Sequence, residues 1–359
     1  MTSRERFLRT MRYQEVDHPP IGIPGPWPIT RKRWEQEGLP KGMDLHEYFE
    51  VPPASMRHVG FETVLYPPFK EKIFEKTDDY VIKIDARGVK VKNFADESSM
   101  AIHLEYPIKG RASLGWLREK LNPENPGRLD PDWLEKIREV EKKNNCLSLC
   151  NGGQYFAFLN EHMGTEQLLT TYFDDPDFIH EVNDLQCRCC EKGLNTVLPE
   201  FKLDFVGYHE DMAYKTGPLI SPKMFREFMS PYYARIQKIT KKYSVDIHLM
   251  DSDGNIWELI PLWLELGVNV MAPLEAAAGM DVVALRKEFG RELRMVGGFD
   301  KRIMASSDKK DIKKELERIR PVIEDGGYIP GLDHGAPPDI PFENVCYYID
   351  CLKQMFSAR

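Results

Sequence analysis

The stretch Val245-Asp-Ile-His-Leu-Met-Asp-Ser-Asp-Gly254 decides the fold. An apolar strand pattern runs into an acidic turn that contains a histidine, and a helical pattern begins directly after it. In repeated strand-then-helix units, side chains at the carboxyl end of each strand point into the mouth where substrates bind. The pattern therefore places His248, Asp251 and Asp253 where chemistry takes place.

The same order of strand, polar turn and helix recurs from residue 145 onward, which is typical of βαβ units. Six strands are clear: Cys146–Cys150, Leu203–Tyr208, Val245–Met250, Val268–Ala272, Leu293–Val296 and Tyr328–Leu332. Two weaker ones, Pro20–Ile23 after an N-terminal helix and Phe61–Leu65, complete a set of eight. We therefore predict an α/β protein with one (β/α)8 barrel, a single domain over residues 1–359 with an N-terminal helical extension, rather than two doubly wound halves.

An insertion follows the second predicted strand. Residues 81–92 alternate apolar and charged side chains around Ala86-Arg-Gly88, so residues 72–94 are predicted to form an antiparallel β-hairpin. Because the insertion leaves the carboxyl end of a strand, we expect it near the mouth. Two interpretations stay open: a partial lid, and a structural flap that takes no part in substrate binding.

Composition limits the class of protein. The 359 residues are 42% hydrophobic and 30% charged, with no apolar run of about twenty residues and no secretion signal at the start. Seven cysteines, an odd number, suit free thiols in a reducing compartment. The net charge of -8 opposes binding to nucleic acid or anionic lipid. We therefore expect a cytoplasmic protein that binds neither nucleic acid nor membranes.

Acidic and histidine residues gather at the predicted strand ends. They are His209, Glu210, Asp211, His248, Asp251, Asp253, Glu275, Asp300, Asp333 and His334. A single acidic residue at such a position is often only a helix cap, and Asp253 is the best candidate for one. Several carboxylates around one axis repel each other unless a proton, a cation or an arginine compensates them. Imidazole and carboxylate groups from separate strands are also suitable zinc ligands.

Other candidates have competing structural explanations. After the first strand, Trp27 and Arg31 are positioned to hold an aromatic or carboxylate-bearing ligand. A lone histidine such as His248 is as often a satisfied core residue as a functional one. Cys187-Arg-Cys-Cys190 lies within a helical segment, where neighbouring thiols point in different directions, so packed thiols are favoured over a metal site. The remaining candidates for substrate contacts are His209, Asp253, Glu275 and Asp333.

Nearly the whole chain resembles the uroporphyrinogen decarboxylase superfamily, which also contains cobalamin-dependent methyltransferases. The resemblance rests on Ser3–Met11 with Asp17–Pro20, Gly217–Pro222 with Phe225–Phe228 and Pro231-Tyr232, His248–Gly254, Gly297–Asp300, and Gly326–Ile329 with Asp333-His334. True decarboxylases carry an Arg-Gln-Ala-Gly-Arg-Tyr element after the first strand and an aspartate after the second. This chain has Pro24-Gly-Pro-Trp-Pro28 and Tyr66-Pro-Pro68 there, so the resemblance favours the methyltransferase branch.

That branch commonly binds zinc through a His-x-Cys element and a later cysteine. Here His248 matches the histidine, Met250 stands at the cysteine, and Asp333-His334 falls at the later ligand. The resemblance thus implies a mixed oxygen and nitrogen zinc site made by Glu210, His248 and His334. Its position at a strand end makes Asp251 a further candidate catalytic residue. It implies a methyl ether or similar small methylated substrate, activated by a Lewis acid or a general acid, and a corrinoid carried by a partner protein as acceptor.

Two other functions stay open. A uroporphyrinogen decarboxylase, or a related metal-free decarboxylase, needs arginines that converge on its cavity, and Arg31 and Arg33 alone are a poor set for a tetrapyrrole with eight carboxylates. A non-catalytic barrel would bind a small ligand or a corrinoid protein without turnover. The sequence leaves open whether the chain is a monomer or a homodimer.

Overall fold

The computed structural model describes residues 1–52, 55–59, 61–95, 100–143 and 146–357. Its main element is a parallel sheet of seven strands in the order β1-β6-β7-β10-β11-β12-β13. The strands are β1 (Ser55–His58), β6 (Cys146–Gly153), β7 (Phe205–His209), β10 (His248–Asp251), β11 (Val270–Ala272), β12 (Arg294–Phe299) and β13 (Tyr328–Leu332). The α/β class is therefore confirmed, and the strand order is consistent with a TIM-like barrel.

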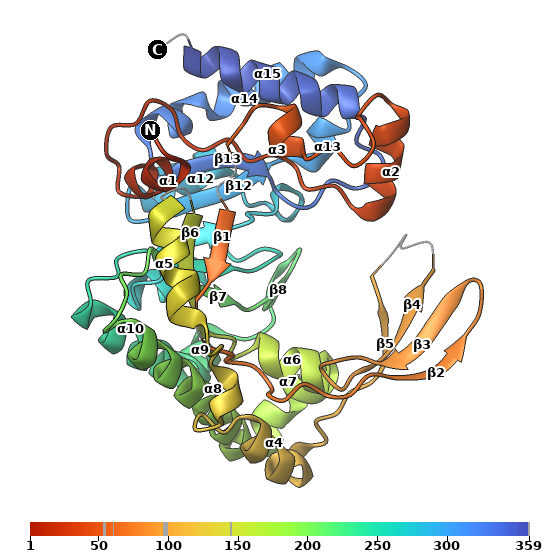
Figure 1. Cartoon of the computed structure of the whole chain (residues 1–359), viewed down its shortest axis with the longest axis vertical. Helices are drawn as coiled ribbons and strands as arrows, with labels where there is room; N and C mark the ends of the chain where they lie inside the picture. The colour runs from red at the N-terminus through yellow and green to blue at the C-terminus, as the bar shows by residue number, and fades with distance from the viewer. Residues whose placement is uncertain (53–54, 60, 96–99, 144–145, 358–359) are drawn as a thin grey trace.

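Helices surround this sheet (Figure 1). They are α1 (Ser3–Met11), α2 (Pro28–Gln36), α3 (Leu45–Tyr48), α4 (Leu114–Lys120), α5 (Trp133–Lys143), α6 (Ala157–Met163), α7 (Thr165–Asp174), α8 (Pro176–Val197), α9 (Pro222–Phe228), α10 (Ser230–Lys242), α11 (Ile260–Glu265), α12 (Val282–Phe289), α13 (Lys301–Met304), α14 (Lys309–Asp325) and α15 (Phe342–Ser357). A short pair, β8 (Ala213–Tyr214) and β9 (Gly217–Pro218), follows β7.

Cys187, Cys189 and Cys190 are free and buried on α8, as predicted for packed thiols. Within the described residues, no helix combines the length and apolar character needed to cross a membrane.

Strand parity divides the core into two parts, because successive side chains of a strand point to opposite faces. One part contains Phe205, Ile247, Val270 and Ile329 from several strands, packed against Phe7 and Met11 of α1. It fills the inside of the curved sheet, and α1 covers the amino-terminal side. The larger part lies between the sheet and the outer helices and includes Val206, Tyr208 and Met250.

The two weakest predicted strands differ from the structure. The second strand is β1, several residues before the predicted Phe61–Leu65. Phe61 forms an isolated antiparallel bridge with Leu129. β1 is at an end of the sheet order, and Met56, Arg57 and His58 are exposed, with Met56 at 59%, so these positions show no apolar pattern. The segment 20–26 is not a regular strand, yet it lies along β13, where the Gly22 amide donates to the Pro330 carbonyl at 2.9 Å. Its prolines remove the donors that a regular strand needs.

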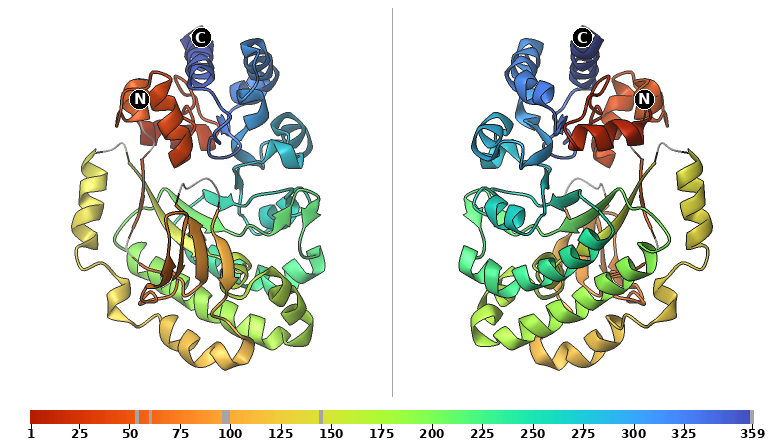
Figure 2. Two further views of the ribbon diagram at one scale, coloured as in Figure 1. Left: turned by 90° about the vertical axis from the view of Figure 1, so that its right-hand side faces the viewer. Right: turned by 90° about the vertical axis from the view of Figure 1, so that its left-hand side faces the viewer.

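The insertion is larger than the predicted hairpin. Strands β2 (Lys72–Lys76), β3 (Tyr80–Ile84), β4 (Lys90–Phe94) and β5 (Ile102–Glu105) form a four-stranded antiparallel sheet. The predicted turn does join β3 to β4, where the Asp85 amide donates to the Val89 carbonyl at 2.9 Å. Figure 1 shows this small sheet standing apart from the main sheet, and in the left view of Figure 2 it lies in front of the rest of the chain.

Candidate active site at the carboxyl ends of the strands

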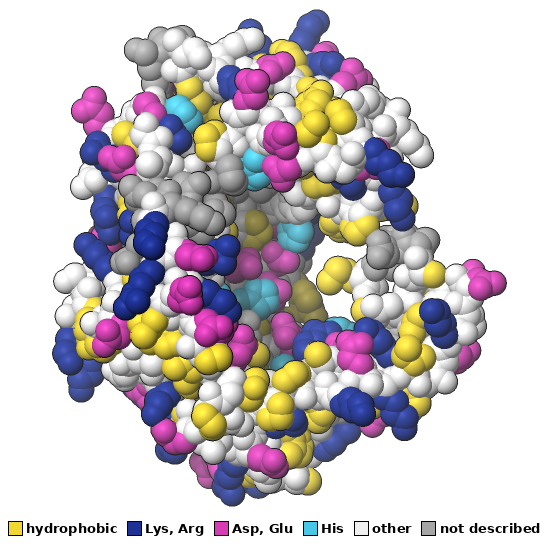
Figure 3. All heavy atoms as spheres, in the orientation of Figure 1, with side chains coloured by type: hydrophobic (Ala, Val, Ile, Leu, Met, Phe, Trp, Pro, Cys, Tyr) yellow, Lys and Arg dark blue, Asp and Glu magenta, His cyan; other side chains and the backbone are white. Residues whose placement is uncertain are grey.

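Strand parity also sorts the candidate residues at the carboxyl ends. His209 has the parity of Phe205, and Asp251 has the parity of Ile247, so both side chains point to the inside of the curved sheet. Glu210 and His248 have the opposite parity and point toward the outer helices. Figure 3 shows that the centre of one face is hollowed and that histidine and acidic side chains gather in the hollow.

His209 is the centre of an ionic cluster. Its Nδ1 lies 3.4 Å from Asp251 Oδ2, and its Nε2 lies 3.5 Å from Asp211 Oδ2 and 3.7 Å from Glu161 Oε1. Hydrogen bonds to Asp251 and Glu161 raise the pKa of His209 to about 11, although burial opposes this. The imidazole is therefore a cation at neutral pH, held by three carboxylates.

The loop after β10 connects this cluster to a second histidine. The Asp253 amide donates to Asp211 Oδ1 at 3.0 Å, and Asp253 Oδ2 lies 3.3 Å from His334 Nε2. The hydrogen bond to Asp253 is the largest influence on His334 and raises its pKa. Gly254 lets the loop approach β8, since a Cβ there would lie 2.4 Å from the Ala213 carbonyl oxygen. Asp253, predicted as the best candidate for a plain helix cap, instead joins the two histidine groups.

Trp27 lies beside the second histidine. A Cβ at position 335 would be only 3.1 Å from the Trp27 indole nitrogen, so the indole packs directly on the backbone that follows His334. The Trp27 amide donates to the Ala336 carbonyl at 3.1 Å, which fixes this contact. Trp27 is half-buried.

Two more acidic candidates have structural partners. Glu275 lies 3.5 Å from Lys301 Nζ and accepts a hydrogen bond from the Gly254 amide at 3.2 Å. Asp333 is fully buried and accepts from the backbone amides of Ala276 and Lys301 at 3.1 and 3.2 Å. Burial raises the pKa of Asp333. Asp333 thus connects three strand ends and offers no exposed surface to a substrate.

Glu210 is a buried helix cap. Its carboxylate accepts from the backbone amides of Tyr155, Phe156 and Ala157 at 2.9, 2.7 and 3.0 Å, and also from the Tyr233 hydroxyl. These amides belong to the start of α6, where no local side chain caps the helix. Burial raises the pKa of Glu210. The strand end therefore supplies the cap that the helix lacks.

His248 is packed in the outer layer. Its Nδ1 lies 3.2 Å from the Tyr208 hydroxyl and its Nε2 lies 3.3 Å from the Val245 carbonyl oxygen, and only 2% of the residue is exposed. Burial lowers the pKa of His248 to about 4, so the ring is neutral at neutral pH. This is the satisfied core histidine that the sequence allowed as an alternative.

The zinc set implied by the resemblance does not fit these positions. The lone pairs of Glu210 are used by four donors, and both ring nitrogens of His248 face polar atoms of the outer layer. His334 belongs to a different group, with Asp253. No three His, Cys, Asp or Glu side chains are arranged to hold a metal ion anywhere in the described part of the chain.

The structure adds residues that sequence reasoning missed. Glu161 lies on α6, within a helix rather than at a strand end, and no sequence signal singles it out. One carboxylate oxygen of Glu161 lies near His209, and the other lies 3.9 Å from Arg87 Nη1. Arg87 belongs to the turn between β3 and β4. The insertion thus contacts the ionic cluster. Lys301 directly follows Asp300 after β12, and a search for cations at strand ends would have found it.

Arg31 does not reach this cluster. It pairs with Glu35 at 3.1 Å and donates to the Met43 carbonyl oxygen at 2.5 Å.

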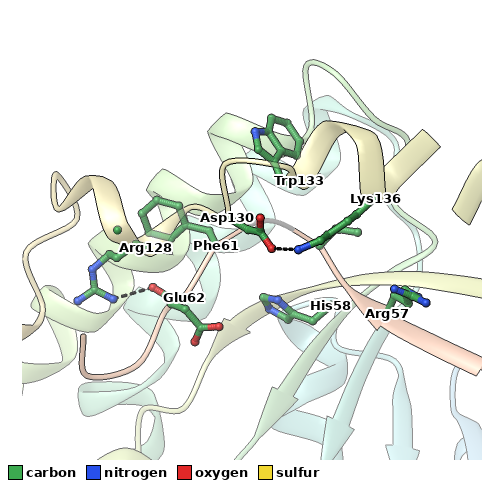
Figure 4. A pocket seen from close by; sticks show the side chains of 10 residues that line it. Arg57, His58, Phe61, Glu62, Arg128, Asp130, Trp133 and Lys136 are labelled. Carbon is green, nitrogen blue, oxygen red and sulfur yellow. Dashed lines mark hydrogen bonds and ion pairs between the residues drawn. The ribbon is translucent and has the colours of Figure 1, made fainter. Parts of the chain in front are cut away.

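A separate cavity of about 400 Å³ lies between β1 and α5 and shares no lining residue with the cluster (Figure 4). Its lining includes Arg57, Phe61 and Trp133, and its Lys136 is already paired with Asp130. The ionic cluster, not this cavity, joins the candidate residues.

The charge on His209 predicts a pH-dependent stability. Because the pKa of His209 is higher in the folded chain, about 11, than the usual value near 6.5, the ionic cluster stabilises the fold fully below about pH 6.5. This contribution is lost as the pH rises toward 11. Urea unfolding of the wild type and of His209→Gln should therefore give free energies that converge between pH 7 and pH 10. If the difference between the two unfolding free energies stays constant from pH 7 to pH 10, His209 does not have the raised pKa described above.

Comparison with known proteins identifies the family of this chain. The model of the uroporphyrinogen decarboxylase family matches residues 156–355, more than half of the chain. Uroporphyrinogen decarboxylase from a Nostoc species is 22% identical over 97% of this chain and 96% of its own length. The enzyme of the same name from Legionella pneumophila is 25% identical over 42% of each chain. Among solved structures, a methyltransferase from Methanosarcina mazei aligns over 99% of both chains with a TM-score of 0.61 and 15% identity, a likeness of fold.

Proposed function

This chain belongs to the uroporphyrinogen decarboxylase family, and within it we propose that the protein is a methyltransferase. It moves a methyl group from a small methyl ether to a corrinoid carried by a partner protein. The observation that carries the proposal is the His334–Asp253 pair, an imidazole at the mouth beside the His209 cluster whose pKa the hydrogen bond to Asp253 raises. The full-length likeness in fold to a methyltransferase supports it.

The step needs a proton donor. A methyl ether is a poor electrophile because its leaving group is an oxygen anion, and a general acid removes that charge. The reduced cobalt of the acceptor supplies the electron pair for the new bond to carbon, and the methyl–oxygen bond breaks with its electron pair left on oxygen. His334 gives that oxygen the Nε2 proton that it otherwise holds against Asp253, and it takes another from solvent. The products are the methylated acceptor and an alcohol or phenol.

The other residues of the mouth hold this acid and shape the site. Asp253 orients His334 and stabilises its protonated form. His209 remains a cation, and it keeps Asp211 and Asp251 together at the inside of the mouth. Glu161 connects the His209 cluster to the insertion through Arg87. Because Glu210 and His248 do not fit a zinc site, we derive no step through a metal.

A porphyrinogen decarboxylase is the second candidate, because the curated relatives carry that name. The charges at the mouth are unfavourable for a porphyrinogen substrate. Arg31 is paired with Glu35, and Arg33 is paired with Glu37 and the Pro338 carbonyl, so neither is available to a substrate carboxylate. The carboxylates around His209 repel a substrate with eight carboxylates.

The test is methyl transfer to free reduced cobalamin, which needs no partner protein. Purified chain should convert a methoxyphenol to the corresponding diol and methylate the cobalamin in equal amounts, with no carbon dioxide released from a uroporphyrinogen. Loss of the methyl acceptor, followed by absorbance, measures the rate. Carbon dioxide release without methyl transfer would instead support the decarboxylase.

A further inference from the structure

We propose that the cavity between β1 and α5 binds a small zwitterion with an apolar group, such as a short peptide or an aromatic amino acid. The cavity has a volume of about 400 Å³, within the roughly 300 to 1,000 Å³ that is usual for small-molecule sites. Its lining residues lie outside the His209 cluster, so the proposal does not depend on the methyltransferase assignment. The class of ligand follows from the charges and the rings that line the cavity.

Two opposite charges in the cavity are left without a partner among the described residues. Lys136 and Asp130 neutralise each other in an ion pair. Arg57 and Glu62 also line the cavity, and both are exposed. Neither side chain forms a hydrogen bond or an ion pair with another residue of the described chain. One positive and one negative charge are therefore open to a ligand.

A histidine stands between these two charges. Figure 4 shows the side chains of Arg57 and Glu62 on either side of His58. The His58 imidazole has no hydrogen bond to another described residue. The protein around the ring removes water from it and lowers the pKa of His58, although Glu62 opposes this. The ring is therefore neutral at neutral pH, and a neutral imidazole donates one hydrogen bond and accepts one.

A zwitterion satisfies all three groups. A guanidinium binds a carboxylate through two parallel hydrogen bonds, so the carboxylate of the ligand suits Arg57. The Glu62 carboxylate accepts hydrogen bonds and donates none, so it suits an ammonium. The peptide group of a dipeptide both donates and accepts, as a neutral His58 does. A ligand with a single charge would instead face one unmatched or repelling side chain.

Two buried rings accommodate the apolar part of the ligand. Phe61 and Trp133 line the cavity and are only 4% and 9% exposed. A ligand side chain that packs on these rings removes its apolar surface from water, and an aromatic side chain adds favourable ring contacts. We therefore expect glycyl-L-phenylalanine to bind more tightly than glycylglycine.

The wall that carries Glu62 is fixed before a ligand binds. The buried guanidinium of Arg128 donates to the carbonyl oxygens of Glu62 and Val64 at 2.6 and 2.8 Å. The Glu62 amide donates to the Arg128 carbonyl at 2.8 Å, and Arg128 also donates to the Asn122 carbonyl oxygen at 2.8 Å. Because this backbone is already held in place, binding requires little reordering of it.

Calorimetric titration of the full chain tests the proposal with glycyl-L-phenylalanine and two analogues that each lack one charge. The methyl ester has no carboxylate, and the N-acetyl compound has no ammonium. The dipeptide should bind with a Kd about tenfold to a hundredfold lower than either analogue, because each analogue loses a hydrogen bond between charged groups. L-Phenylalanine, titrated beside the dipeptide, shows which of the two zwitterions the cavity prefers, and either order of affinity supports the proposal.

Two variants place the ligand in the cavity. Arg57→Gln should remove the preference for the dipeptide over its methyl ester but keep the preference over the N-acetyl compound. Glu62→Gln should show the opposite pattern. Both residues are exposed, so both variants should keep the unfolding midpoint of the wild type. The matched controls are Arg138→Gln and Glu135→Gln, exposed residues of α5 that do not line the cavity, and they should leave both preferences unchanged.

Three results would overturn the proposal. The first is that none of these compounds binds at millimolar concentrations. The second is that an analogue with one charge binds the wild type as tightly as the dipeptide does, because one of the two open charges then has no role. The third is that Arg57→Gln and Glu62→Gln keep both wild-type preferences, which would place the bound dipeptide elsewhere on the chain.

Discussion

Replacing His334 by glutamine should lower the rate of methyl transfer to reduced cobalamin by about two to four orders of magnitude, the usual contribution of a general acid. Glutamine can still form a hydrogen bond with Asp253, but it has no proton to give to the leaving oxygen. The side chain of His334 is about a third exposed, so the variant should fold normally. Its far-ultraviolet circular dichroism and its unfolding midpoint should match those of the wild type.

A pH profile distinguishes an acid from a residue that only holds the site together. The wild-type rate should fall as the pH rises through the pKa of His334, which Asp253 holds above its usual range, because only the protonated ring is active. That limb should be missing in His334→Gln. His46→Gln is the matched control. The Nδ1 of His46 lies 3.1 Å from the Val51 carbonyl oxygen, as the Nδ1 of His334 lies 2.9 Å from the Asp333 carbonyl oxygen, and His46 takes no part in the ion pairs of His209 and His334. A folded His334→Gln that keeps its rate would contradict the role of the acid.

Replacing Glu210 by alanine should destabilise the fold by about 3 to 5 kcal/mol, because three backbone amides at the start of α6 and the Tyr233 hydroxyl lose their acceptor in a buried place. Glu210→Gln should cost about 2 kcal/mol, since it keeps one acceptor oxygen but turns an amide donor toward other donors. Urea unfolding measures both changes.

A matched control makes the cause clear. Glu258→Gln removes the same charge from an exposed position beyond β10 and should change the free energy of unfolding by less than about 0.5 kcal/mol. If Glu210→Ala unfolds with the wild-type free energy, the carboxylate does not cap α6 and the structural role assigned to Glu210 is wrong.

The sequence predicts the class of fold well because six strands are buried and therefore carry a continuous apolar pattern. Each of them is found at or within a few residues of its predicted position. The edge strand β1 was not predicted, because Met56, Arg57 and His58 are exposed and need no apolar pattern. The insertion was predicted in part, because β5, which pairs with β4, lies beyond the hairpin signal.

The candidate site shows where sequence reasoning reaches its limit. The strand ends were located correctly, but a strand end presents two neighbouring residues to opposite sides. Reading the alternation from Phe205 to His209 would have selected His209 over Glu210, and the same reading selects Asp251 over His248. Glu161 could not be found in this way, because only the packing of α6 against β7 brings it to the cluster.

The most direct test of this account compares Glu210→Gln with His334→Gln in one assay, methyl transfer to reduced cobalamin per folded molecule. If the His209 and His334 groups form the reaction site and Glu210 is a helix cap, folded Glu210→Gln should keep its rate within about threefold while His334→Gln loses about a hundredfold or more. Equal losses of rate in the two variants, at equal folded fraction, would contradict this assignment and would indicate that Glu210 takes part in the reaction.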